Sequence, residues 1–125
     1  MAASSDELWE EAWEARDRGD FAKLKSILLS IDGTHGHRVS YLVGLALAQW
    51  ELGERVEAEQ LMRELTRRRP DNEHFSLTLF HILRDRGREE DAFAEGKRFL
   101  DSHSAEQCQE YHRLIREWHQ ELFGD

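Results

Sequence analysis

The sequence predicts an all-α protein built from a repeating helix–turn–helix unit, and three observations support this prediction. A glycine recurs at a step of 34 residues, at Gly19, Gly53 and Gly87. Between these glycines the apolar residues recur every three or four positions, as they do along one face of a helix. The chain has one proline, and no segment alternates apolar and polar residues as a half-buried strand does. A fixed period of this length indicates stacked supersecondary units, because one unit cannot bury its own apolar face.

Further positions keep the same step around each glycine. Leucine or alanine stands five residues after it, an apolar residue twelve after it and an acidic residue two before it: Leu24, Ala58 and Ala92; Ile31, Leu65 and Phe99; Asp17, Glu51 and Asp85. We therefore predict a single domain over residues 1–125, with repeats at 5–38, 39–72 and 73–106 and a capping helix at 105–122. The predicted fold is a helical repeat solenoid of seven helices.

The first repeat is predicted to start with a helix from about Asp6 to Arg18. Ser4 followed by Glu7 has the spacing of a capping box, in which the serine accepts a bond from one free amide and the glutamate reaches back to another. Asp20 follows the turn glycine and is suited to cap a second helix. The segment 32–38 is predicted to be a loop from its composition.

Four further helices make up the second and third repeats. They are predicted at Ser40–Leu52, Arg55–Arg68, Glu73–Arg86 and Glu89–Asp101. Three arginines, residues 67–69, stand at the carboxyl end of the second of these helices, where cations interact favourably with the helix dipole. Pro70 then stops that helix.

A seventh helix is predicted from a capping box at Ser104 and Gln107 to about Leu122. Its apolar residues form one stripe: Tyr111, Leu114, Ile115, Trp118 and Leu122. Its opposite face is polar: Arg113, Arg116, Glu117 and Gln120. A repeat stack needs such a terminal element, so we interpret this helix as a cap. Trp118 and Leu122 are expected to pack on the sixth helix, near Phe93, Phe99 or Leu100.

Composition excludes several classes of function. The formal net charge of −9 argues against nucleic acid and anionic membranes as partners, since both bind through lysine and arginine. No apolar run is long enough to span a bilayer, and no apolar signal core follows Met1. Cys108 is the single cysteine, so the chain forms no internal disulfide. We expect a cytoplasmic protein.

The period of 34 residues with two helices per period resembles the tetratricopeptide repeat. The segment Gly19–Phe21 resembles the turn of that family, and Arg69–Asn72 resembles its linker. Small residues at the helix crossings also match: Ala12, Ala46, Ala58 and Ala92. Some positions depart from the family pattern: Leu8, Leu42 and Ser76 replace the first-helix tryptophan, Phe80 replaces a small crossing residue and Ser104 replaces a proline.

In each predicted repeat the first helix has two faces. One is an interhelical core: Leu8, Ala12 and Ala15; Leu42, Leu45 and Ala46; Leu79, Phe80 and Leu83. The other is a stripe at positions thirteen, ten, six and three before each glycine: Asp6, Trp9, Trp13 and Arg16; Ser40, Val43, Leu47 and Trp50; His74, Leu77, His81 and Arg84. The family resemblance implies that these stripes line a concave groove that holds a peptide or helix. Tryptophan and arginine are also typical of binding hot spots.

An alternative is that the groove is closed, with Trp9 and Trp13 folded against Val43, Leu47 and Trp50. The family resemblance also implies one partner class to exclude, the acidic tails of chaperones held by a carboxylate clamp. The matching positions here lack the Lys, Arg and Asn of that clamp: Trp9, Trp13, Gly44, His74 and Thr78. The acidic residues beside each turn instead favour a partner segment with apolar anchors and some basic residues.

Signals for chemistry are few. His35 with His37, and Cys108 with His112, are spaced like metal ligands, but neither pair has an evident third ligand. No glycine-rich phosphate loop is present, since the glycines mark helix turns. We therefore predict no catalytic residues, no metal and no cofactor.

The predicted function is a non-enzymatic protein–protein interaction module, an adaptor or a small chaperone. Bacterial type III secretion chaperones are similar in being short, acidic, three-repeat proteins. The alternative is a scaffold that self-assembles through the tryptophan-bearing face, with a homodimer as its simplest form.

Overall fold

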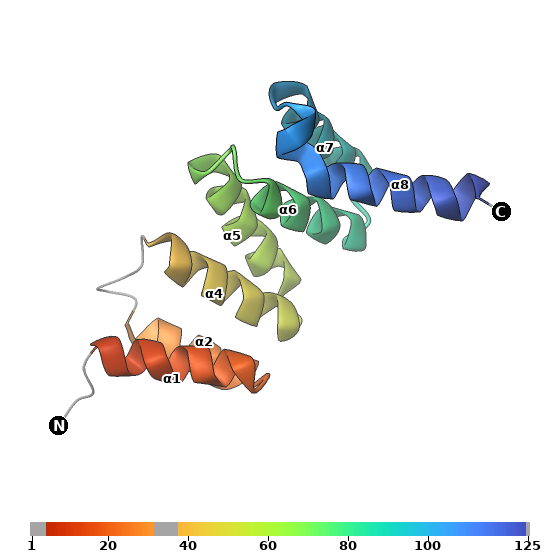
Figure 1. Ribbon diagram of the computed structural model, residues 1–125. Coiled ribbons are helices and arrows are strands. Elements are labelled where there is room, and N and C mark those ends of the chain that lie inside the picture. Colours follow the sequence, from red (N-terminus) through yellow and green to blue (C-terminus); the bar gives the residue numbers. More distant parts are fainter. Residues whose placement is uncertain (1–4, 32–37, 125) are drawn as a thin grey trace. The chain divides into compact units, whose positions relative to one another are not determined.

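The computed structural model describes residues 5–31 and 38–124, which form seven α-helices and one 3-10 helix with no strand among them (Figure 1). The elements are α1 (Ser5–Asp17), α2 (Phe21–Ser30), α4 (Val39–Glu51), α5 (Arg55–Arg68), α6 (Glu73–Asp85), α7 (Glu89–Ser102), the 3-10 helix η1 (Ala105–Cys108) and α8 (Gln109–Phe123). The predicted all-α class and the seven helices are confirmed. The predicted cap at Ser4 and nearly all of the predicted loop at 32–38 lie outside the described residues.

The recurring glycine has a clear structural cause. Gly19, Gly53 and Gly87 have φ of +75°, +83° and +75°, in the left-handed region that side chains with a Cβ rarely adopt. The next residue in each turn donates its backbone N–H to the carbonyl five residues earlier, as in Asp20 to Ala15 at 2.9 Å. The same bond follows the other two glycines at 2.8 Å. Three helices therefore end in one type of glycine turn, which closes their last carbonyls.

Side-chain caps fix two helix starts. The Asp20 carboxylate accepts a hydrogen bond from the Lys23 backbone amide at 3.2 Å, as the sequence predicts for α2. Asn72 does the same for α6, because its side-chain oxygen accepts from the Phe75 amide at 3.0 Å. A capping box at Ser104 and Gln107 is present too, although it opens the 3-10 helix rather than α8 directly.

The chain forms two compact units, Met1–Leu65 and Thr66–Asp125, whose boundary falls within α5. In the first unit α1 packs against α2, and α2 packs against α4. Gly44 allows this packing, since a methyl group built there would lie 3.2 Å from Leu28 Cδ1 and 3.4 Å from the Trp13 ring. The core of this unit contains many of the predicted residues: Ala12, Ala15, Leu24, Leu28, Leu42, Leu45 and Ala46.

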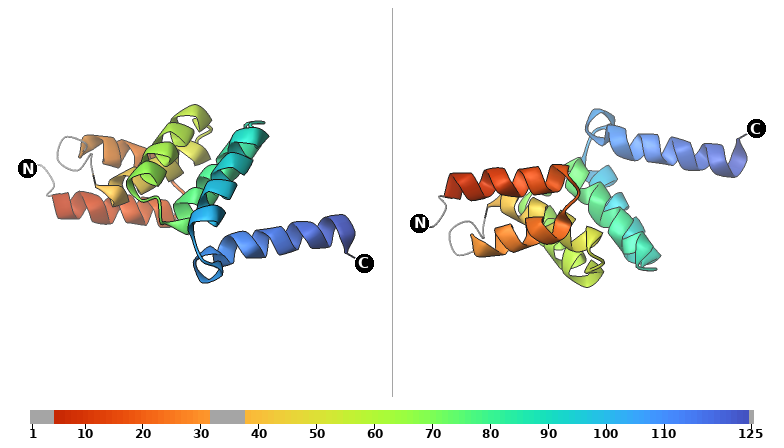
Figure 2. Two further views of the ribbon diagram at one scale, coloured as in Figure 1. Left: turned by 90° about the horizontal axis from the view of Figure 1, so that it is seen from above. Right: turned by 90° about the horizontal axis from the view of Figure 1, so that it is seen from below.

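In the second unit α6 packs against α7, and α8 lies against α6 (Figure 2). Phe80 of α6 is 3% exposed at the centre of this unit. Its ring contacts those of Phe93, Tyr111 and Trp118 at centroid distances of 5.9, 6.0 and 5.6 Å. A large residue fits at this crossing because the facing α7 residue is Gly96, where an added Cβ would lie 3.5 Å from the Phe80 ring.

Ser76, another departure from the family pattern, is completely buried and hydrogen bonded. Its hydroxyl donates to the Glu95 carboxylate of α7, and the Tyr111 hydroxyl of α8 donates to it at 2.7 Å. Arg98 holds the same carboxylate through its Nη2 at 2.7 Å and its Nε at 2.9 Å. Burial raises the pKa of the Tyr111 phenol. This network joins α6, α7 and α8.

The cap prediction for α8 is half right. Trp118 packs as expected beside Phe93, with ring centroids 6.4 Å apart. The expectation for Leu122 is wrong, since this side chain is 74% exposed and the adjacent Phe123 is 73% exposed. The reason is length: the carboxyl-terminal part of α8 projects past the α6–α7 pair and has no helix of that unit beside it (Figures 1 and 2).

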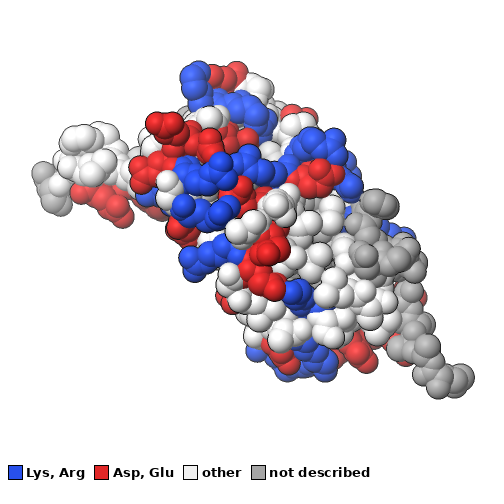
Figure 3. Space-filling view, turned by 180° about the vertical axis from the view of Figure 1, so that it is seen from behind, with Lys and Arg blue, Asp and Glu red and all other residues white. Residues whose placement is uncertain are grey.

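Charged side chains are intermixed on the surface. In the face that Figure 3 shows, lysines and arginines lie beside aspartates and glutamates over much of the charged surface. Several pairs lie within one helix turn, such as Arg88 with Asp91 at 3.0 Å and Arg98 with Glu95 at 2.7 Å. The negative net charge therefore does not gather in one continuous patch on that face.

Candidate functional site

The tryptophans predicted on α1 form a ladder of stacked side chains. The Trp9 and Trp13 rings stack with centroids 5.4 Å apart, and the Arg16 guanidinium carbon lies 4.8 Å from the Trp13 ring centroid. Their sequence spacing of four and three residues places them on one helix face. Both rings are half-buried, whereas Arg16 is exposed and pairs with Asp17 at 3.1 Å. We call Trp9, Trp13 and Arg16 the tryptophan ladder.

The tryptophan ladder is partly supported by α4. One edge of the Trp13 ring lies against Gly44, where an added Cβ would be 3.4 Å from the ring. This contact places Trp13 beside α4, but through Gly44 rather than through Val43, Leu47 or Trp50, which the closed alternative names. The ring nevertheless keeps partial exposure.

The predicted α4 residues also share a helix face. Val43, Leu47 and Trp50 are all half-buried. The Arg55 guanidinium lies 4.9 Å from the Trp50 ring centroid. The sequence pattern missed Arg55 because it belongs to the next helix and comes near Trp50 only through the glycine turn.

The second unit contains a groove between α6 and α8. Its volume is about 260 Å³, and its α6 wall includes His74, Leu77 and His81. These are three of the four residues predicted on this helix. We call this the α6–α8 groove. Arg84, the fourth predicted residue, lies elsewhere, with its guanidinium 4.6 Å from the Trp118 ring centroid.

The opposite wall of the α6–α8 groove was not predicted from the sequence pattern. This wall comes from α8: Glu110, Arg113, Leu114 and Glu117. The pattern assigned Arg113 and Glu117 to the solvated face and Leu114 to the packed face. Leu114 is the residue that could have indicated this wall, because it is apolar and lies where the packed face of the helix meets the solvated face.

Charge distinguishes the two walls of the α6–α8 groove. Partial burial and the neighbouring Arg84 lower the pKa of the His81 imidazole below its ordinary value of 6.5, although Asp85 opposes this shift. His81 is therefore uncharged at neutral pH. On the α8 wall Glu110, Arg113 and Glu117 are exposed, whereas Leu77 and Leu114 are half-buried, so the two leucines form an apolar floor beneath the charged side chains.

Because the pKa of His81 is lower in the folded than in the unfolded chain, the unfolded state binds the proton more readily. The free energy of unfolding should therefore fall as pH drops from about 6.5 through the folded-state value. Between about pH 8 and about pH 5, wild type should lose more stability than His81→Gln, as measured by urea unfolding at each pH. Equal losses in the two proteins would contradict this prediction.

The tryptophan ladder and the α6–α8 groove belong to different compact units. In each of them, predicted residues of one helix lie together on one face of that helix. That the three stripes converge on one concave surface stays a prediction.

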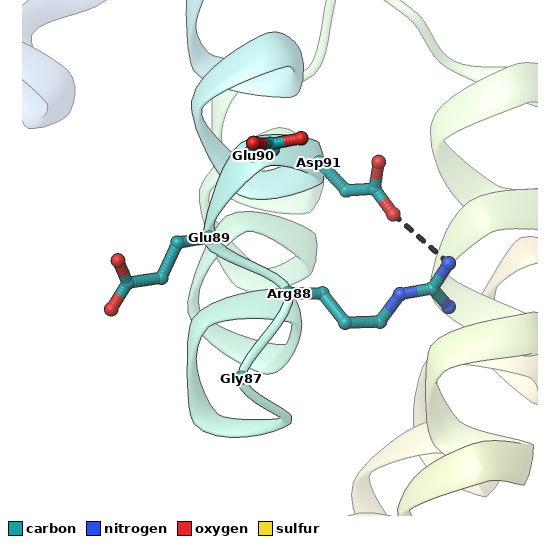
Figure 4. A pocket seen from close by; sticks show the side chains of 5 residues that line it. All are labelled: Gly87, Arg88, Glu89, Glu90 and Asp91. Carbon is teal, nitrogen blue, oxygen red and sulfur yellow. Dashed lines mark ion pairs between the residues drawn. The ribbon is translucent and has the colours of Figure 1, made fainter.

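The hollow at the start of α7 is a different kind of feature. It is lined by Gly87, Arg88, Glu89, Glu90 and Asp91 and has a volume of about 360 Å³. Figure 4 shows the three carboxylates pointing in different directions, with only Asp91 turned to Arg88. Acidic residues in a first helical turn are explained by the helix dipole. We therefore interpret this hollow as the outside of the glycine turn.

Possible metal ligands and the Cys108 thiol are candidates for chemistry in the described part of the chain. No group of three or more His, Cys, Asp or Glu residues there could hold a metal ion. His35 and His37 lie outside the described residues. Cys108 is 1% exposed, and burial raises the pKa of its thiol, which keeps it protonated and poorly nucleophilic.

A scan against models of protein families finds no match, and neither does a search of curated proteins. None of the described helices is both long and apolar enough to cross a bilayer.

Proposed function

We propose that this protein is a non-enzymatic interaction module of the tetratricopeptide type, which holds a segment of a protein partner in the α6–α8 groove. The observation that carries this proposal is the groove itself. Three residues that the repeat pattern singles out, His74, Leu77 and His81, line it together with a charged wall from α8. An apolar floor with polar walls is a common form of peptide-binding surface.

The tryptophan ladder adds a second contact region. Stacked, half-buried rings with an arginine at one end have the composition of a binding hot spot. Two stacked rings in partial contact with water form a contiguous apolar surface, which a partner can cover. We include Val43, Leu47 and Trp50 in this contact region for the same reason. The groove and the ladder need no metal, cofactor or catalytic group to act.

The cellular role in this proposal is that of an adaptor or a small cytoplasmic chaperone. The single, buried cysteine suits a reducing compartment. The similarity to bacterial secretion chaperones rests on size, charge and repeat number, so it is an analogy of fold.

Leu77→Asp tests the proposal, because it places a charge on the floor of the groove. A partner that co-purifies with the wild-type protein should then be titrated, as a purified component, against wild type and variant. Its dissociation constant should rise at least roughly tenfold, the scale of a hot-spot loss. Leu29→Asp is the matched control, since Leu29 is an exposed leucine in the other unit.

Unchanged affinity for Leu77→Asp would contradict the groove assignment. Both variants must keep the wild-type circular dichroism spectrum and a similar urea midpoint. Light scattering on the same samples tests the scaffold alternative. A stable oligomer of the wild type that Leu77→Asp dissociates would favour self-assembly over an adaptor.

A further inference from the structure

We propose that the α6–α8 groove recognises a helix that carries basic, acidic and basic side chains in that order along one flank, and that Glu110, Arg113 and Glu117 read this pattern. The inference rests on the proposed function, since it names the chemistry of the partner that the groove would hold. It follows from three properties of the α8 wall: the order of its charges, their spacing and their lack of ion-pair partners.

The charges on the α8 wall are free to meet a partner. Elsewhere in this unit charges three or four residues apart pair within their helix, as Arg88 does with Asp91 and Lys97 with Asp101. Glu110, Arg113 and Glu117 have the same spacing. Within residues 5–31 and 38–124, however, they form no ion pair. A complementary charge from outside would therefore gain an interaction without breaking one.

The spacing of the three charges identifies a helical partner. Seven residues of helix separate Glu110 from Glu117 by about 10.5 Å, with Arg113 about 4.5 Å from the first. A second helix repeats these distances at positions i, i+3 or i+4 and i+7 of one face. An extended strand does not, since its same-face residues fall about 6.6 Å apart and then about 13 Å apart.

The rest of the groove fits the same partner. Leu77 and Leu114 form an apolar floor beside the charged wall, so the matching helix has an apolar stripe next to its charged flank. His81, on the facing wall, is uncharged at neutral pH and does not compete with the basic residues for the carboxylates. Glu110 and Glu117 outnumber Arg113, which favours a segment of net positive charge.

The test uses the whole protein and a phage-displayed library of amphipathic helical peptides of about 20 residues, or about 30 Å. Peptides should be selected on immobilised wild type in the presence of excess soluble Leu77→Asp. The variant removes peptides that bind other surfaces, so binders of the groove are recovered. We expect lysine or arginine at positions i and i+7, with an acidic residue between them. Glu117→Lys should weaken such a peptide at least roughly tenfold, because it sets like charges against each other.

Matched controls separate local charge from net charge. Glu106→Lys and Glu121→Lys make the same change at exposed sites outside the groove, and they should leave the affinity within roughly twofold of wild type. Glu106 also stands in the first turn of its helix, as Glu110 does, so it controls for the helix dipole. A peptide with glutamate in place of the contacting lysine should recover binding to Glu117→Lys.

Two outcomes overturn the inference in distinguishable ways. The charge pattern is wrong if the groove-binding peptides lack basic residues, or if Glu117→Lys and Glu121→Lys weaken their binding equally. The proposed function would still stand in either case. If no selected peptide binds Leu77→Asp more weakly than wild type, the groove binds no helix and the inference fails. The proposed function is then decided separately, by the effect of Leu77→Asp on the affinity of the co-purified partner.

Discussion

Replacing Phe80 with alanine should lower the free energy of unfolding by about 3–5 kcal/mol, the usual cost of removing a buried aromatic ring. Phe80 is 3% exposed and joins the rings of Phe93, Tyr111 and Trp118. The residue facing it is Gly96, which has no side chain to move into the space. The cavity should therefore persist. Urea unfolding followed by circular dichroism measures the loss.

Phe93→Ala is the control for this prediction. It removes the same side chain from the same ring cluster, but Phe93 is 52% exposed and leaves less of a cavity. Its cost should be less than half that of Phe80→Ala. Equal costs would mean that Phe80 is not the centre of the second unit.

Leu45→Ala should cost more folding stability than Trp13→Ala, whereas Trp13→Ala should weaken partner binding more than Leu45→Ala. Leu45 is 8% exposed, and its loss should cost about 2–5 kcal/mol of folding free energy. Trp13 is only half-buried, against Gly44, so its replacement should cost less. Partner affinity should instead fall by about 2 kcal/mol or more for Trp13→Ala, the scale of a tryptophan hot spot.

The measurement for this pair is a urea midpoint and a partner titration on each variant. Leu45→Ala should keep its affinity wherever it stays folded, because Leu45 faces the core. If Trp13→Ala destabilises the protein as much as Leu45→Ala does, the tryptophan ladder is part of the core. Its assignment to a binding surface then fails.

The two candidate regions differ in how they depend on their surroundings. The contacts that define the tryptophan ladder lie within α1, at sequence separations of three and four residues. The α6–α8 groove needs two helices, and the network of Ser76, Glu95 and Tyr111 helps to hold them together. Changes in that network should therefore disturb the groove without touching its lining.

The sequence determined the helices and their order. Wherever both ends of a helix were predicted, they agree with the observed ends to within about two residues, except where η1 precedes α8. The glycine step was decisive because each turn needs a residue at positive φ, and glycine adopts that conformation most readily. Local requirements of this kind are recorded in the sequence itself. The ladder of Trp9, Trp13 and Arg16 was predictable for the same reason.

Only the tertiary structure decided how the departures from the repeat are accommodated. Phe80 replaces a small residue at a crossing position, and Gly96 of the neighbouring helix leaves room for its ring. Ser76 stands where the family has a tryptophan, and Tyr111 and Glu95 satisfy its buried hydroxyl. In each case the compensating residue lies on another helix, so its role depends on how the two helices pack.

The tertiary structure also decided which side chains of the last helix are covered. Periodicity placed Leu122 in the packed stripe and Glu117 on the solvated face. In the structure Leu122 projects beyond the supporting helices, and Glu117 lines the α6–α8 groove. Helical period assigns each residue to a face, but the length of the neighbouring helices and the path of the chain through η1 set what that face meets. These depend on contacts between helices, which the sequence pattern of one helix does not contain.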